Sequence, residues 1–250
     1  MKDKFEMAKN ASELRKVLGE DDRSQIDIFR LVQSIDNLTL VFYPMGDNIS
    51  GMCIKGEKNI IIAINSSMSY GRQRFTMAHE LYHCYFDEGI NTTICSKDID
   101  SNNDVEKEAN LFASFFLAPP VSLSDEIKKI KSTGNKLDVS AVVKLEQFFG
   151  LSRQAILVRL IDEKELGAQD AAAMRTGIIS TAVSLGYDDT LYRPVSEEKQ
   201  YMTYGQYIKQ AEQLKELDLI SEGKYEELLL EAFRSDIIYG SDDMEGELID

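Results

Sequence analysis

The sequence predicts an α+β protein in which a small three-stranded sheet packs on two helices and a helical C-terminal region follows. Three observations predict this class. Short β-branched runs cluster between positions 38 and 65, apolar residues recur every three to four positions elsewhere, and one such helical stretch holds both histidines. With 250 residues, of which 43% are hydrophobic and 28% charged, the chain is long enough to bury a core of its own.

Before position 120 we expect two helices, then three strands, then two further helices. Apolar spacing predicts amphipathic helices over 11–18 and 25–35. Three β-rich runs follow, and the turn residues 56–58 between the last two are typical of a hairpin; the runs are 38–43, 49–54 and 59–65. One helix should then run from about 70–74 to 86, and another over 104–117, ended by Pro119 and Pro120.

The rest of the chain has helical patterns. Three helices are predicted, over 125–131, 139–149 and 153–161, the last with Ser152 as its N-cap. Two stronger patterns, 204–217 and 222–234, predict an antiparallel helical hairpin with Ser221 as the cap of its second helix. Residues 235–250, rich in Asp, Glu and Gly, are expected to form a frayed tail.

Charge divides the chain into three parts. Residues 166–250 hold 18 acidic and 7 basic residues and so carry -11 of the total charge of -15. The change coincides with a small-residue stretch around Gly167 that could join two bodies. We therefore expect a core over 1–120, a helical, helix-turn-helix-like segment over 121–166, and an acidic helical region over 167–250.

Composition argues against several classes of protein. A charge of -15 is unlike that of a protein held to nucleic acid or an anionic membrane by bulk electrostatics. The start of the chain has no apolar signal region, and no apolar run approaches the roughly 18 residues of a membrane span. Three cysteines without a CxxC spacing argue against a disulfide framework or a thiolate zinc knuckle. A cytoplasmic location is therefore expected.

Both histidines lie in the stretch His79-Glu80-Leu81-Tyr82-His83, an HExxH motif inside a predicted helix. Spacing of four places both imidazoles on one helix face, where they can reach a single zinc ion, with Glu80 at the flank of that face. Glu80 can act as general base on zinc-bound water and then protonate the leaving amine of a cleaved peptide. Two buried imidazoles without a metal would leave four ring nitrogens in need of partners, which favours a metal site.

A catalytic zinc ion usually has three protein ligands, and no third histidine exists in the chain. The third ligand must therefore be a carboxylate or a thiolate, and the downstream candidates are Asp87, Glu88, Cys95, Asp104, Glu106 and Glu108. Asp87 and Glu88 are too close in sequence to fold back easily onto the HExxH helix. Glu106 is preferred over Glu108, because it shares a helix stripe with small residues that would allow close approach.

The sequence also resembles a known family. The run RFTMAHELYH at 74–83, followed by EKEANLFA at 106–113 and by LAP at 117–119, is similar to the ImmA/IrrE metallo-endopeptidases. This resemblance implies a gluzincin-like zincin fold, with His79, His83 and Glu106 as Zn2+ ligands, Glu80 as general base, and 1–120 as the zinc metallopeptidase core. It further implies a cytoplasmic bacterial protease, often of mobile elements, that cleaves a helix-turn-helix repressor and so regulates transcription.

Several points stay open at this level. An oxyanion-stabilising side chain cannot be histidine, and Tyr43, Tyr70, Arg72 and Arg74 are candidates. The substrate is expected to pair with a strand edge at 49–54. Two other functions compete with proteolysis: a DNA-binding regulator that uses 139–161 through Arg153 and Arg159, and a catalytically silent regulatory or antitoxin/toxin-type interaction protein that retains the zinc site. The oligomeric state cannot be inferred.

Overall fold

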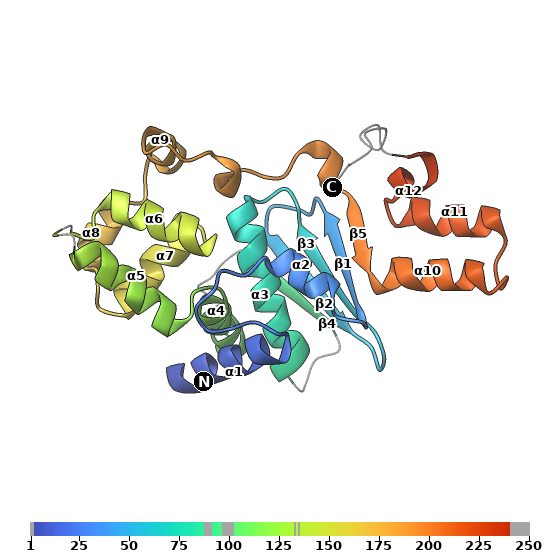
Figure 1. The fold of residues 1–250 in the computed structure, drawn as a ribbon, viewed down its shortest axis with the longest axis horizontal. Coiled ribbons are helices and arrows are strands. Elements are labelled where there is room, and N and C mark those ends of the chain that lie inside the picture. The colour runs from blue at the N-terminus through green and yellow to red at the C-terminus, as the bar shows by residue number, and fades with distance from the viewer. Residues whose placement is uncertain (1–2, 88–91, 97–102, 133, 135, 241–250) are drawn as a thin grey trace, which may run out of the picture.

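The structure of the chain is a computed structural model that describes residues 3–87, 92–96, 103–132, 134 and 136–240. Its central part contains five strands and four helices (Figure 1). In chain order these are α1 (Lys4–Val17), α2 (Ile28–Gln33), β1 (Leu38–Tyr43), β2 (Ile49–Lys55), β3 (Ile60–Asn65), α3 (Tyr70–Phe86), β4 (Thr92–Ser96), α4 (Asp104–Leu117) and, much later, β5 (Met202–Gly205).

The strands form one sheet in the order β4-β2-β3-β1-β5. β2 and β3 form the expected antiparallel hairpin, β1 runs parallel to β3, and β4 and β5 are antiparallel edge strands. The α+β class is confirmed, but the prediction of three strands was wrong, because the sheet has five. Both missed strands are edges of four or five residues, too short for period-two alternation to be recognised.

One face of the sheet is covered by α3, which contacts β2 and β3. Burial alternates along β3, where Ile60, Ile62 and Ile64 are buried and Ile61 is exposed, as expected for a sheet with one covered face. The other side of α3 packs on α4, which also contacts α1. Helix α3 therefore lies between the sheet and α4.

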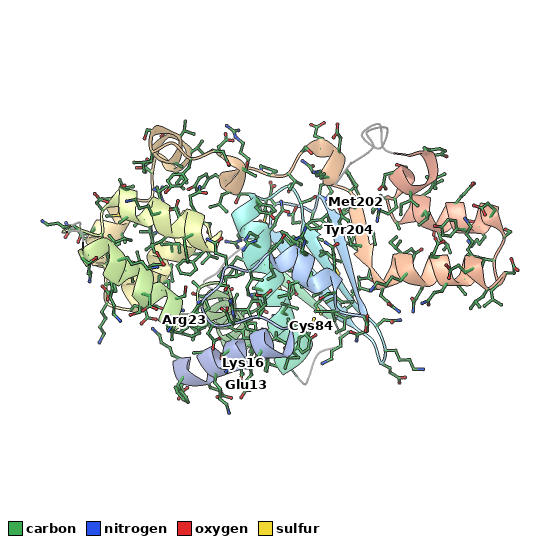
Figure 2. The ribbon with its side chains drawn as sticks, viewed as in Figure 1. Glu13, Lys16, Arg23, Cys84, Met202 and Tyr204 are labelled. Carbon is green, nitrogen blue, oxygen red and sulfur yellow. The ribbon has the colours of Figure 1, made fainter. Side chains whose placement is uncertain are left out.

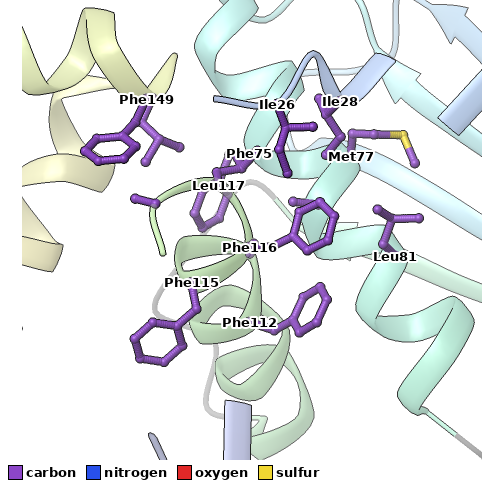
Figure 3. Close-up of a cluster of buried hydrophobic side chains, with 14 of the residues drawn as sticks. Ile26, Ile28, Phe75, Met77, Leu81, Phe112, Phe115, Phe116, Leu117 and Phe149 are labelled. Carbon is purple, nitrogen blue, oxygen red and sulfur yellow. The ribbon is translucent and has the colours of Figure 1, made fainter. Parts of the chain in front are cut away.

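Aromatic side chains of α4 fill the space between these helices (Figure 3). Phe112 and Phe116 are fully buried and stack at 5.6 Å between ring centroids. From α3, the rings of Tyr82 and Phe86 pack on Phe112 at centroid distances of 5.6 and 5.3 Å. Burial of each such side chain contributes about 1.5–3 kcal/mol to the free energy of unfolding. This packing fixes α4 against α3.

The remaining α-helices lie at the two ends of the molecule (Figure 1), and two short 3-10 helices, η1 (Thr190–Tyr192) and η2 (Glu197–Lys199), lie on the segment between α9 and β5. At one end are α5 (Pro120–Ser132), α6 (Val139–Phe149), α7 (Arg153–Asp162), α8 (Ala168–Ala173) and α9 (Ile178–Ser184). At the other end are α10 (Gln206–Glu216), α11 (Glu222–Glu231) and α12 (Ser235–Tyr239). Ser152 and Ser221 cap α7 and α11 as predicted. Residues 235–239 form a helix rather than a tail, and 241–250 lie outside the described residues.

The C-terminal region contributes directly to the sheet, because β5 pairs with β1. Met202 and Tyr204 of this strand are shown in Figure 2, and the Tyr204 ring packs edge-on against Phe42 of β1. The prediction that 204–217 is all helix was therefore wrong at its start. The division of the chain at 120 and 166 stays a prediction.

Helices α6 and α7 are held together by a buried ion pair. Arg153 is 1% exposed, bonds the fully buried Glu146, and donates to the Met174 carbonyl. Arg159 is also buried, lies over the Phe115 ring and pairs with Glu163. Neither arginine is accessible to a phosphate backbone, so the structure gives the DNA-binding alternative no basic surface at these two residues.

The junction between β5 and α10 depends on Gly205. Its backbone has φ +88° and ψ -139°, a region that side chains disfavour, and a Cβ there would lie 2.3 Å from the Leu38 carbonyl oxygen. We expect Gly205→Ala to lower the free energy of unfolding in urea by about 2 kcal/mol or more. Gly186→Ala is the matched control, because Gly186 has the same φ of +88° and no atom near its Cβ position. Equal losses in both variants would contradict the role of the Leu38 contact.

Candidate metal centre

The two histidines lie on α3, a helix that is buried along most of its length. Residues 73–84 of α3 are all buried, and His79 and His83 are 6% and 3% exposed. Because they are one helical turn apart, their rings face the same side, and the two Nε2 atoms are 3.2 Å apart. The two Nε2 atoms, each able to bind a metal ion, thus point at one location.

Glu106 reaches the same location from the first turn of α4. Its Oε2 lies 3.2 Å from His79 Nε2, and its Oε1 lies 3.5 Å from His83 Nε2. The close approach of the two helices is possible because Ala109 and Ala113 are fully buried on this part of α4. The small-residue stripe that favoured Glu106 in the sequence is therefore present at the contact between α3 and α4.

Glu108 points elsewhere. Residues two positions apart on a helix differ by about 200° in direction, so Glu106 and Glu108 cannot face the same neighbour. Glu108 is 7% exposed and accepts a hydrogen bond of 2.7 Å from the Tyr82 hydroxyl. Its carboxylate belongs to the packing between α3 and α4, away from the histidine Nε2 atoms.

Each histidine is oriented through its other ring nitrogen. Nδ1 of His79 lies 2.9 Å from Oδ1 of Asn110, and Nδ1 of His83 lies 3.1 Å from Oδ2 of Asp87. Because oxygen accepts at both positions, Nδ1 carries the proton and the Nε2 lone pair is directed toward Glu106. The sequence suggested Asp87 only as an unfavourable ligand, although its spacing of four from His83 could have indicated this supporting contact.

The charges of this cluster are strongly interdependent. Burial lowers the pKa of His79, but the hydrogen bond to Glu106 and the charges of Glu80 and Glu106 outweigh burial and raise it. Burial and the neighbouring His79 lower the pKa of His83. Burial raises the pKa of Glu106, but its contacts with both histidines outweigh burial and lower that pKa overall. The two inward-facing imidazoles and the Glu106 carboxylate are therefore electrostatically coupled.

A divalent metal ion fits this donor set. Ligands placed tetrahedrally at 2.0–2.1 Å from an ion lie about 3.3 Å from one another. The distances among the two Nε2 atoms and the Glu106 oxygens are 3.2, 3.2 and 3.5 Å. An ion at this position could satisfy both nitrogens and the carboxylate together.

Glu80 lies beside this cluster and is completely buried. Neither of its carboxylate oxygens has a hydrogen-bond partner in the part of the chain that the structure describes. Burial raises the pKa of Glu80 to about 7, against the lowering effects of His79 and the Cys95 thiol. A buried carboxylate left without a partner is costly, which is typical of a group kept for chemistry rather than stability.

The space for Glu80 depends on a glycine of the sheet. A Cβ atom at Gly51 of β2 would lie 2.9 Å from Glu80 Oε1 and 2.6 Å from Thr76 Cγ2. A side chain there would therefore push both residues of α3 out of place. No local pattern signalled this role, because Gly51 occurs inside a run that is simply typical of a strand.

Cys95 of β4 belongs to the same group of donors. The ligand atoms of His79, His83, Cys95 and Glu106 all lie within 4.8 Å of one another. The thiol is 1% exposed, and burial together with the charges of Glu80 and Glu106 raises its pKa. Cys95 was one of the sequence candidates for a third ligand, but nothing in the sequence placed it beside Glu106, because β4 was not predicted.

Most of the residues proposed for the oxyanion have structural contacts instead. Arg74 donates to the carbonyls of Gly150 and Ile26, the Tyr43 ring packs against Tyr201, and the Tyr70 ring packs against Phe29. Arg72 lies in the first turn of α3 and is likewise engaged with neighbouring groups.

The expected substrate strand also needs correction. β2 (Ile49–Lys55) lies between β3 and β4, so it presents no free edge. The edge strand on this side of the sheet is β4, which carries Cys95 next to the donor cluster. The error has a simple cause, because the edge of a sheet can be identified only when all of its strands are known.

Comparison with known proteins agrees with this geometry. Residues 37–161 match the model of the IrrE N-terminal-like domain family, Peptidase_M78. The chain belongs to this family. A 116-residue stretch is 30% identical to the radiation response metalloprotease IrrE of Deinococcus deserti, and covers 44% of this chain and 40% of that protein. The match thus spans less than half of the relative's length, and it confirms the ImmA/IrrE resemblance. Among the described residues, no helix is long and apolar enough to cross a membrane.

The hydrogen bonds to Nδ1 lead to a testable prediction. We expect Asn110→Ala and Asp87→Ala each to weaken metal binding by about 10–100-fold, because each removes the group that orients one imidazole. Competition between the protein and a chromogenic chelator measures this affinity. Asp170→Ala, on the exposed surface of α8, is the control and should bind metal as the wild type does. Unchanged affinity in both site variants would contradict the orienting role.

Proposed function

We propose that this protein is a zinc-dependent endopeptidase that hydrolyses peptide bonds of a specific protein partner. The observation that carries the proposal is the convergence of His79, His83 and Glu106 beside the buried carboxylate of Glu80. Among the residues that the structure describes, that carboxylate has no hydrogen-bond partner. Two imidazoles, one carboxylate and an adjacent second carboxylate match the protein groups of zinc peptidases whose metal has two histidine ligands and one glutamate ligand. Membership of the Peptidase_M78 family supports the same activity.

In this proposal each residue has a distinct task. His79, His83 and Glu106 hold the zinc ion, and Asn110 and Asp87 keep the imidazoles in the correct tautomer and orientation. When bound, zinc acts as a Lewis acid that lowers the pKa of a coordinated water and polarises the scissile carbonyl. Glu80 accepts a proton from the attacking water and then delivers it to the leaving amine.

The substrate peptide is proposed to lie along β4. An extended peptide that pairs with an edge strand is held through its backbone, and side-chain pockets then add specificity. β4 is the edge next to the donor cluster, whereas β5 is the edge at the far side of the sheet. Pairing at β4 would bring the peptide beside Glu80.

We propose a helix-turn-helix transcriptional repressor as the partner that is cleaved. The family resemblance supports this choice, and so does the charge of this chain, of which -11 lies in residues 166–250. A DNA-binding protein carries clustered positive charge, which an acidic surface attracts. The proposed setting is the bacterial cytoplasm.

The second candidate function is an interaction protein that keeps the zinc site without catalysis. The observation that favours it is the hairpin of α10 and α11, which projects from the sheet (Figure 1) and exposes acidic residues next to Leu214, Leu217 and Leu230. Such a surface could dock a partner without cleavage. Only a cleavage assay separates the two functions.

The deciding experiment compares wild type and Glu80→Gln. The repressor encoded nearest to this gene is incubated with each zinc-loaded protein, and fragments are identified by mass spectrometry. We expect cleavage by the wild type and a rate about 10²–10⁴-fold lower for Glu80→Gln at equal zinc content, because the base is lost while the ligands remain. Glu57→Gln, in the exposed hairpin turn, should cleave as the wild type does. Cleavage by Glu80→Gln at the wild-type rate would contradict the mechanism.

Gly51→Ala gives an independent test of how Glu80 is positioned. The added methyl group would displace Glu80 and Thr76, so we expect the cleavage rate to fall at least about tenfold while bound zinc is retained. Gly46→Ala is the matched control, because no atom lies within 4 Å of its Cβ position. A Gly51→Ala protein with wild-type kcat would show that the position of Glu80 is not limited by this contact.

A further inference from the structure

Cys95 is a buried thiol that the mechanism above does not use. In the antiparallel pair of β2 and β4, Cys95 is directly opposite Gly51. Opposite residues of such a pair have side chains on the same face of the sheet. Since the Gly51 Cβ position faces Glu80 and Thr76, the Cys95 side chain also points at α3, at the level of the HExxH motif.

The thiol reaches the metal donors from a different element of the fold than the other ligands do. His79 and His83 come from α3 and Glu106 from α4, whereas Cys95 comes from the sheet. All four ligand atoms lie within 4.8 Å of one another. Two imidazoles, a carboxylate and a sulfur bound tetrahedrally to one ion would be about 3.3–3.6 Å apart, so side-chain movements of about 1 Å bring the set together.

We propose that Cys95 is a fourth protein ligand of the metal, so that the resting centre is a closed site of two histidines, one glutamate and one cysteine. This inference rests on the metal centre of the proposed function. On binding, the thiol loses its proton to solvent and a sulfur–metal bond forms, with no change of oxidation state. The four-ligand set has the coordination of a structural zinc site rather than that of a catalytic one, which keeps a position open.

The consequence is a latent enzyme. The attacking water and the Cys95 sulfur compete for one coordination position, and hydrolysis requires that Cys95 is released. Its strand is suited to such a change, because among the described strands β4 pairs only with β2. Cys95→Ala should therefore bind metal about tenfold more weakly. At saturating zinc it should hydrolyse substrate faster than the wild type, because no sulfur competes with the water, and a slower variant would overturn the latency.

The other two cysteines provide matched controls. Cys53 and Cys84 are both 3% exposed, and their sulfur atoms are 3.0 Å apart between β2 and α3. Figure 2 shows Cys84 on α3. Neither sulfur belongs to the group of metal donors. A spectroscopic signal or a protection effect that is specific to Cys95 can therefore be separated from a general effect on buried thiols.

The test uses the full chain loaded with Co²⁺ in place of zinc, in reducing buffer. We expect wild type and Cys53→Ala to show near-ultraviolet sulfur-to-cobalt charge-transfer absorption, and Cys95→Ala to lose it while keeping the visible bands of bound Co²⁺. Wild-type protein that binds one Co²⁺ without charge-transfer absorption would overturn the role of Cys95 but leave the site of two histidines and Glu106 intact. Wild-type protein that binds no metal would instead contradict the proposed function.

A second measurement does not depend on the folding of a variant. Alkylation of each cysteine in the wild-type protein is followed by mass spectrometry, with zinc and after its removal by a chelator. We expect zinc to slow alkylation of Cys95 at least about tenfold more than alkylation of Cys53 and Cys84, because a metal-bound thiolate is not free to react. Equal protection of all three thiols would overturn the proposal.

Discussion

The structure depends on the burial of α3 between the sheet and α4. Both contacts require small residues: Gly51 on the sheet side, and Ala109 and Ala113 on the α4 side. Because α3 is enclosed, its polar side chains cannot be solvated and must find partners within the protein. The position of one helix therefore determines which groups meet at the centre and forces them to interact.

The charges of the centre follow from this enclosure. His79, His83 and Glu80 are almost completely removed from water, and Glu106 is partly buried beside them. Hydrogen bonds to Asn110 and Asp87 satisfy the outer ring nitrogens only. The inner nitrogens and the Glu106 carboxylate face one another, and a bound dication would be coordinated by all three groups.

Local sequence signals predicted the helices and the meeting of His79, His83 and Glu106 better than they predicted the sheet. The bounds of β1, α4 and α6 could be predicted from the sequence, because periodicity, caps and prolines act over a few residues. The choice of Glu106 over Glu108 could be made for the same reason, since it depends on one helix face. The sequence could not predict β4 or β5, because a short edge strand is defined by its pairing with a distant partner. It therefore could not predict the location of Cys95 either. The need for Gly51 opposite Glu80 is likewise a property of the packed structure.

The central claim is that His79, His83 and Glu106 bind one zinc ion. X-ray diffraction from crystals of the zinc-loaded protein, recorded at the zinc absorption edge, tests this most directly. We expect a single anomalous peak about 2.0–2.2 Å from Nε2 of both histidines and from a Glu106 oxygen. An anomalous peak elsewhere, or no peak in a protein whose α3 and α4 are arranged as described, would contradict the claim.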